Sequence, residues 1–302
     1  MSATVYAEVV AIDGVIPRVV DASCEENDIE RLLPWVYKHH AVAEGNCIRR
    51  WPMEEYLFRN FFFDWNSYRT GLYESSVSMS SFLKASETVT LPRKNWKVPS
   101  REGSVNLLQW QGRMLQTLIQ AVYFELDELE MQTPELEFPV ARFKQSYVIG
   151  GKRYAARPEG AVIAKLQERS VPVVSCAGWI EGESRSCFLA DILSIMLGQL
   201  AGNIGSSMQD QEVYIIGIHG PNVYIARTLF TADQIIRVHS KGCSETEVVK
   251  LGFTRGFDLT LRDDWREATR AMSRLLRYLL SGGSRIDAIQ ADRDSILQKC
   301  NT

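Results

Sequence analysis

The stretch RPEGAVIAKLQERSVPVVSCAGWIEGESRSCFLADILSIMLGQLAGNIGSSMQDQEVYIIGI, residues 157–218, decides the fold that we predict for this chain. Two short apolar runs at 160–166 and 171–177 predict strands. A helix is predicted from about 186 to 203, where apolar residues recur at helical spacing. The run at 212–218 predicts another strand. The helix should therefore connect two parallel strands of one sheet, with 171–177 central.

Similar patterns continue on both sides of this stretch. A long amphipathic helix is predicted to begin at Ser104. The pair Gly150-Gly151 lies between β-rich runs and predicts a hairpin. A second hairpin is predicted around 219–221, and a last helix from about Asp263 to Leu280. The order helix, three strands, helix and strand predicts an α/β protein in which helices flank a mixed sheet.

The first 103 residues are predicted to form a partly helical N-terminal region, and residues 104–302 the core. Serine, proline and basic residues are dense in 75–103, which predicts an exposed linker. Lys94 and Lys97 in this linker are candidate phosphate contacts, although such runs are more often only solvated. Aromatic residues before the linker predict either part of the core or a surface that docks a protein partner. They are Tyr56, Phe58, Phe61, Phe62, Phe63, Trp65 and Tyr68.

The composition is that of a globular protein, with 45% hydrophobic and 24% charged residues in 302. Because the net charge is -3, nucleic-acid binding would need a local basic patch. We find no signal peptide and no run of ~18 apolar residues, so no membrane association is expected. The six cysteines are scattered without a C-x-x-C pair. This pattern predicts free thiols and an intracellular protein, nuclear or cytoplasmic.

The order of these elements resembles the core of the PD-(D/E)XK nucleases, which have a restriction-endonuclease-like fold, and the motifs are similar to those of fungal members. In that family an acidic residue follows a proline at the start of a strand, as in Arg157-Pro158-Glu159. The next strand carries an acid and, two residues later, a lysine; Ser175 and Ala177 stand at these positions here. The resemblance covers roughly residues 104–280 and includes Gln199 in the helix that follows.

The resemblance implies a metal-dependent chemistry that this chain carries only in part. In the family, two carboxylates bind Mg²⁺, and the metal activates water for attack on a phosphodiester. Glu159 can replace the first acid, but Ser175 is neutral and Ala177 supplies no charge. We therefore expect a catalytically reduced nuclease-like protein that binds nucleic acid or a protein partner. We also expect Glu159 and Ser175 to lie side by side on adjacent strands, facing one cleft.

Two alternatives stay open. In the first, the chain is an active Mg²⁺-dependent nuclease in which Glu181, Glu183 or the helical Glu125 supplies the missing acid, and Lys152 or Arg153 supplies the missing cation. Ser175 and Ala177 could also be engineered replacements of natural catalytic residues. In the second alternative, the chain is a protein-interaction or effector protein with no nucleic-acid role and no cofactor. Magnesium is implied only if the chain is active.

Two hairpin arginines, Arg153 and Arg157, join Lys94 and Lys97 as candidates for nucleic-acid binding. Cations near a nuclease motif suit contacts with phosphate. Metal-dependent cleavage would separate the active nuclease from the other functions. Salt-dependent binding of nucleic acid would separate the reduced nuclease from a pure interaction protein.

Overall fold

The strand predicted at 171–177 lies inside a mixed nine-stranded sheet, which confirms its expected interior position. The computed structural model describes residues 3–44, 47–74, 83–91, 105–126, 129, 134–139, 144–167, 169–179, 184–205, 208–244 and 247–300. The strands are β1 (Ala3–Val9), β2 (Ser86–Leu91), β3 (Glu135–Glu137), β4 (Gln145–Ile149), β5 (Lys152–Ala156), β6 (Gly160–Lys165), β7 (Ser170–Gly178), β8 (Gln211–His219), β9 (Asn222–Phe230), β10 (Val248–Phe253) and β11 (Phe257–Asp258). The helices are α1 (Ile12–Val15), α2 (Ala22–Arg31), α3 (Trp35–His39), the 3-10 helix η1 (Cys47–Arg50), α4 (Arg59–Glu74), α5 (Val105–Glu125), α6 (Arg185–Asn203), α7 (Ala232–Ser240), α8 (Arg262–Leu280) and α9 (Asp287–Cys300).

From one edge inward, the sheet follows the order β3-β6-β7-β8-β9 and continues through β10 and β1 to β2 at the other edge. β7 is antiparallel to β6 and parallel to β8, and α6 connects β7 to β8 as the sequence predicted. β8 and β9 form the second predicted hairpin, in which Gly220 has a φ of 53°, a conformation that favours glycine. The short strand β3 adds to β6 at the edge. The predicted helices near 104–126, 186–203 and 263–280 correspond to α5, α6 and α8.

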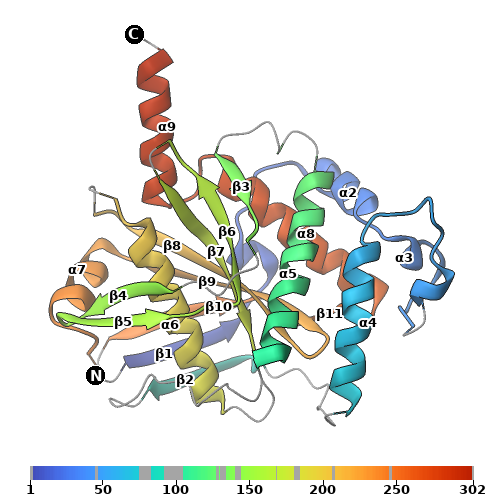
Figure 1. The fold of residues 1–302 in the computed structure, drawn as a ribbon. Coiled ribbons are helices and arrows are strands. Elements are labelled where there is room, and N and C mark those ends of the chain that lie inside the picture. The colour runs from blue at the N-terminus through green and yellow to red at the C-terminus, as the bar shows by residue number, and fades with distance from the viewer. Residues whose placement is uncertain are drawn as a thin grey trace.

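Helices cover both faces of this sheet (Figure 1), with α5 and α6 on opposite sides of β6 and β7. Residues of β8 alternate between the two cores, as expected for a strand that is buried on both faces, whereas in β7 the consecutive residues Val173 and Val174 belong to the same core. Val174 and Cys176 belong to the core under α4, α5 and α8. Ala177 and Ile215 belong to the core under α6. Any catalytic cleft at β7 must therefore face either α5 or α6.

The first predicted hairpin exists, but it does not belong to the main sheet. β4 and β5 form a separate two-stranded sheet that packs against α6. Their turn is made by Gly150 and Gly151, with φ angles of 55° and 74° that two-residue hairpin turns require. A Cβ at Gly198 of α6 would lie 2.7 Å from the Cβ of Gln145, so this glycine permits the close packing. In the main sheet, β3 takes the place that we expected the hairpin to fill.

The N-terminal region contributes to the same sheet as the core. β1 is parallel to β10 and antiparallel to β2, and the sequence analysis expected neither β1 nor β2. β2 lies within the predicted linker at 75–103, most of which lies outside the described residues. On the other side of the molecule, Arg274 and Arg277 of α8 make ion pairs with Glu25 and Asp28 of α2. Residues before and after position 104 are therefore joined by both strand pairing and buried charge.

Most of the aromatic residues before the linker are buried. Phe58, Phe61 and Phe62 pack around Trp265 of α8, with ring centroids 5.0 to 5.5 Å apart. Only two of the seven, Tyr56 and Phe63, are exposed, at 77% and 62%. The aromatic pattern therefore marks mainly a core, and a docking surface there would depend on these two side chains.

One helix in the described part of the chain, α6, is long and apolar enough to cross a membrane by length and composition alone. In this structure, 67% of its apolar window is buried inside the protein. That burial is what the central helix of an α/β core requires, because α6 packs between the sheet and the β4–β5 hairpin.

Candidate functional site

Glu159 precedes β6 and is almost completely buried, at 3% exposure. Its carboxylate oxygen Oε2 accepts a hydrogen bond from the backbone N–H of Gly178, at 3.0 Å. Helix α5 packs directly against it at a glycine: a Cβ on Gly112 would lie 2.5 Å from the Glu159 carbonyl oxygen and 3.0 Å from its Cβ. Glu159 is therefore held on the α5 side of the sheet.

Ser175, the position of the second acid, is completely buried on the other side of the sheet. Its hydroxyl donates to Oε1 of Gln199 in α6, at 2.7 Å, and accepts from Nε2 of Gln145 in β4, at 3.2 Å. Gln199 in turn donates to the carbonyl of Val173, at 2.8 Å. Ser175 thus joins the sheet, α6 and the hairpin. Ala177 lies in the same core under α6.

Our expectation that Glu159 and Ser175 face one cleft is therefore wrong. Gly160 pairs with Cys176, so a regular ladder would place Glu159 opposite Ala177 and on the α6 face. Instead, the N–H of Glu159 donates to the carbonyl of Cys176, at 3.0 Å, and Glu159 lies against α5. The irregular start of β6, together with the space that Gly112 leaves, separates the two motif positions.

These residues do not fit a Mg²⁺ site. Magnesium requires several oxygen ligands in near-octahedral geometry, usually including carboxylates. Here the carboxylate of Glu159 accepts a hydrogen bond from a backbone N–H, and the neutral hydroxyl of Ser175 lies on the opposite face of the sheet. No group of three His, Cys, Asp or Glu side chains that could hold a metal occurs among the described residues.

The alternative catalytic residues that the structure describes lie away from Glu159. Glu125 ends α5 and is about 20 Å along the helix axis from Gly112, which touches Glu159. Lys152 begins β5, about 16 Å along the strand from Arg157. Glu181 and Glu183 lie outside the described residues, as do Lys94 and Lys97.

Two buried side chains near this region are held in their neutral forms. Burial, followed by the charge of Glu159, raises the pKa of the Cys176 thiol to about 12. Burial lowers the pKa of His219 to about 4, and its ring packs 4.1 Å from that of Trp179. At neutral pH, Cys176 is therefore a thiol rather than a nucleophilic thiolate, and His219 carries no charge.

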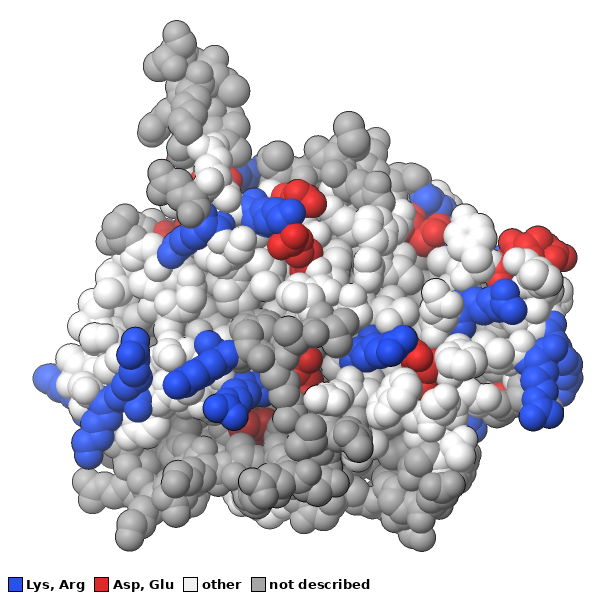
Figure 2. All heavy atoms as spheres, in the orientation of Figure 1, with Lys and Arg blue, Asp and Glu red and all other residues white. Residues whose placement is uncertain are grey.

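Four exposed cations among the described residues lie on or directly beside the β4–β5 hairpin: Lys144, Lys152, Arg153 and Arg157. None of them makes an ion pair with a described residue, whereas Arg266, Arg270, Arg274 and Arg277 of α8 are all paired with acids. Figure 2 shows Lys and Arg side chains gathered over the surface where Figure 1 places β4 and β5. We call the four cations the basic hairpin surface. It includes both arginines predicted from the sequence.

Sequence reasoning missed the residues that give this region its present structure. Gln145 and Gly112 were not singled out, and Gln199 was noted only as part of the resemblance. One signal was present: Gly112 interrupts a long apolar helix, and a glycine there is unfavourable unless another part of the chain approaches closely. The hydrogen bond between Gln145 and Ser175 joins residues 30 apart in sequence, so local patterns do not reveal it.

No protein-family model matches this chain, and no curated protein shows significant similarity to it.

Proposed function

We propose that this chain is a nuclease-like protein that binds nucleic acid without cleaving it. The order β3-β6-β7-β8-β9, with α5 before these strands and α6 between β7 and β8, supports a restriction-endonuclease-like core. Glu159 and Ser175 lie on opposite faces, which favours loss of the metal chemistry. The protein would be intracellular, and its action would require no magnesium.

The basic hairpin surface is the observation that carries the binding role. Arg157 stands two residues before Glu159, so this surface adjoins the degenerate motif. Lys144 and Arg157 flank the last ladder pair, Gln145 with Ala156, so both cations follow the same end of the hairpin ladder. Neighbouring positive charges repel one another, and the phosphates of a nucleic-acid backbone would stabilise them. The net charge of -3 would confine such binding to this surface.

A protein-interaction function is the second candidate. Met53, Tyr56 and Phe63 are exposed at 84%, 77% and 62%. Exposed aromatic and methionine side chains are enriched in protein interfaces. This candidate requires a partner that buries these three side chains and no affinity for nucleic acid.

A binding comparison between two double variants tests the proposal. The first, Lys144→Gln with Arg157→Gln, removes two charges from the basic hairpin surface. The matched control, Lys38→Gln with Arg50→Gln, removes two charges from α3 and η1, on the other side of the molecule in Figure 1. Fluorescence anisotropy with labelled DNA and RNA duplexes and single strands, in EDTA, should show weaker binding only for the hairpin variant. Equal loss in both variants, or no binding by the unmodified protein, would contradict the proposal.

A cleavage assay on the same substrates with Mg²⁺ or Mn²⁺ tests the loss of catalysis. We expect the nucleic acid to remain intact. Cleavage that disappears in Glu159→Ala would instead establish the active nuclease. Failure of both binding and cleavage, together with capture of a partner that is lost in Tyr56→Ser with Phe63→Ser, would favour the interaction protein.

A further inference from the structure

A cavity of about 320 Å³ lies between the β4–β5 hairpin, the second half of α6 and α7. It lies outside the degenerate motif. Its walls are mostly apolar, and Leu197, Leu200, Phe230 and Val238 are all buried there. A concave apolar site of this size with a few polar groups is typical of pockets that bind small organic molecules.

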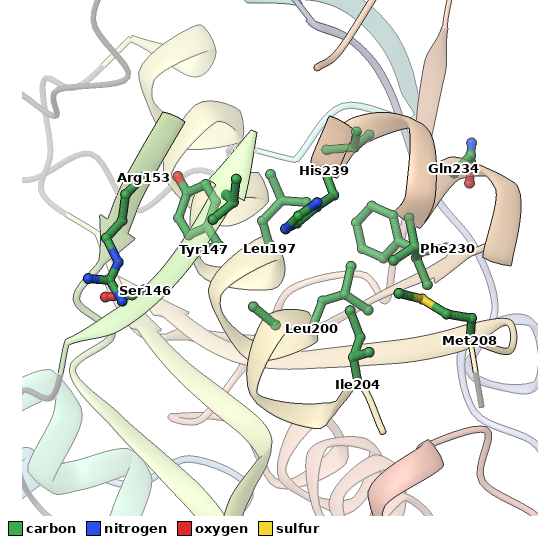
Figure 3. Close-up of a pocket in the computed structure, with 14 residues that line it drawn as sticks. Ser146, Tyr147, Arg153, Leu197, Leu200, Ile204, Met208, Phe230, Gln234 and His239 are labelled. Carbon is green, nitrogen blue, oxygen red and sulfur yellow. The ribbon is translucent and has the colours of Figure 1, made fainter. Parts of the chain in front are cut away.

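The arginine of this cavity gives it one positive side. Arg153 and Ser146 lie together at one side, Phe230 and Met208 at the other, and the imidazole of His239 between them (Figure 3). No acidic side chain occurs among the described lining residues. Arg153 makes no ion pair with a described residue, so its guanidinium remains available to an anionic group.

The walls of the cavity are fixed to one another by hydrogen bonds. The N–H groups of Gly150 and Gly151 donate to the carbonyls of Val238 and His239, at 2.9 and 3.1 Å, and tie the hairpin turn to the end of α7. The hydroxyl groups of Tyr147 and Ser194 lie 2.6 Å apart and tie the hairpin to α6. The cavity is therefore formed by connected elements, and a ligand would bind without first ordering its walls.

We propose that this cavity binds an organic acid that has an apolar body and one carboxylate, such as a medium-chain fatty acid. The apolar body would occupy the space lined by Leu200 and Phe230, and the carboxylate would accept hydrogen bonds from Arg153 and Ser146. The choice of an acid follows from charge complementarity: Arg153, which has no acidic partner among the described residues, lines a mostly apolar cavity. The proposal does not rest on nucleic-acid binding, but Arg153 belongs to both the cavity and the basic hairpin surface, so a bound acid would occupy one of the four cations of that surface.

Isothermal titration calorimetry with octanoate and octan-1-ol tests this proposal, because the two probes share an apolar chain and differ in charge. We expect saturable binding of octanoate at least about tenfold tighter than that of octan-1-ol, the gain typical of a charge-assisted hydrogen bond. Arg153→Met should remove that difference. Arg157→Met, which removes an equal charge that does not line the cavity, should preserve it.

A third variant tests the location. Ala201 is an exposed residue of α6 that lines the cavity, and Ala201→Trp should fill the space and abolish binding of both probes while the urea unfolding midpoint stays near that of the unmodified protein. Absence of saturable octanoate binding at millimolar concentration would overturn the proposal. Equal loss in the Arg153 and Arg157 variants, or binding that survives Ala201→Trp, would also overturn it. Self-association that Ala201→Trp abolishes would identify a second copy of the chain as the occupant instead.

Discussion

Replacing Ser175 by glutamate introduces an acid at the position where the PD-(D/E)XK motif that the sequence resembles has one, and we expect it to destabilise the protein rather than create a metal site. Ser175 is 0% exposed, and its hydroxyl lies between Gln145 and Gln199. Ser175→Glu introduces extra atoms into a packed core, which costs about 1–3 kcal/mol. It also buries a carboxylate that lacks a cation, which costs several kcal/mol more.

The total expected loss is at least about 4 kcal/mol, a large part of the 5–15 kcal/mol that typically stabilises a domain. Ser175→Ala should cost less, about 1–3 kcal/mol, because it leaves Oε1 of Gln199 without the donor that it has now. The control is Val248→Glu, at an exposed position of strand β10, where we expect a change within about 0.5 kcal/mol.

Urea unfolding, followed by tryptophan fluorescence and far-ultraviolet circular dichroism, measures these differences. The predicted order of stability is the unmodified protein and Val248→Glu, then Ser175→Ala, then Ser175→Glu. Equal unfolding midpoints for Ser175→Glu and the unmodified protein would refute the reasoning. So would cleavage of nucleic acid by Ser175→Glu that depends on a divalent cation, because the position would then be a vacant ligand site.

Three further predictions follow from the same region. Gly112→Ala should destabilise the protein by about 1–3 kcal/mol in the same urea assay, because the new Cβ would lie 2.5 Å from the Glu159 carbonyl oxygen. The control is Gly202→Ala, which should be neutral or slightly stabilising, because the nearest atoms to its Cβ would be 3.4 Å away. Mg²⁺ should not raise the unfolding temperature of the unmodified protein or of Glu159→Gln. A rise in the unmodified protein that is absent from Glu159→Gln would reveal a metal site. Burial lowers the pKa of His219 from 6.5 to about 4, so the unfolded chain binds its proton first, and stability that is full above pH 6.5 should fall by about 3 kcal/mol as the pH approaches 4. Urea titrations at several pH values should show that the free energy of unfolding falls less steeply with decreasing pH in His219→Gln than in the unmodified protein. The same pH dependence in both proteins would rule out this role of His219.

The sequence predicted those parts of the fold that depend on local patterns. Continuous apolar runs identified β7 and β8, and helical spacing identified α6 and α8, because strands and helices that are buried in a core leave clear periodicities. β1 was missed although it lies inside the sheet, since its partners β10 and β2 are remote in sequence and its composition is mixed. The separation of the hairpin from the main sheet likewise depends on its packing against α6.

The candidate site was harder to predict because its geometry depends on one irregular residue. The motif positions led us to expect Glu159 and Ser175 side by side in one cleft, and alternation along the strands would put them on one face only if the ladder were regular. The bond from the Glu159 N–H to the Cys176 carbonyl breaks the pattern. The exposed state of Arg153 and Arg157 was compatible with their positions on and beside the hairpin, whereas coordinates were needed to show that neither makes an ion pair with a described residue.

The salt dependence of nucleic-acid binding tests the central claim most directly. Anisotropy titrations of the unmodified protein with a labelled DNA duplex, across a series of salt concentrations in EDTA, give the slope of log K against log salt. Four phosphate contacts from the basic hairpin surface predict a slope of about -3.6, and Lys144→Gln with Arg157→Gln should reduce its magnitude to about 1.8. The duplex should remain intact when Mg²⁺ replaces EDTA. Binding with no salt dependence, a slope that the hairpin variant does not change, or cleavage of the duplex would contradict the account.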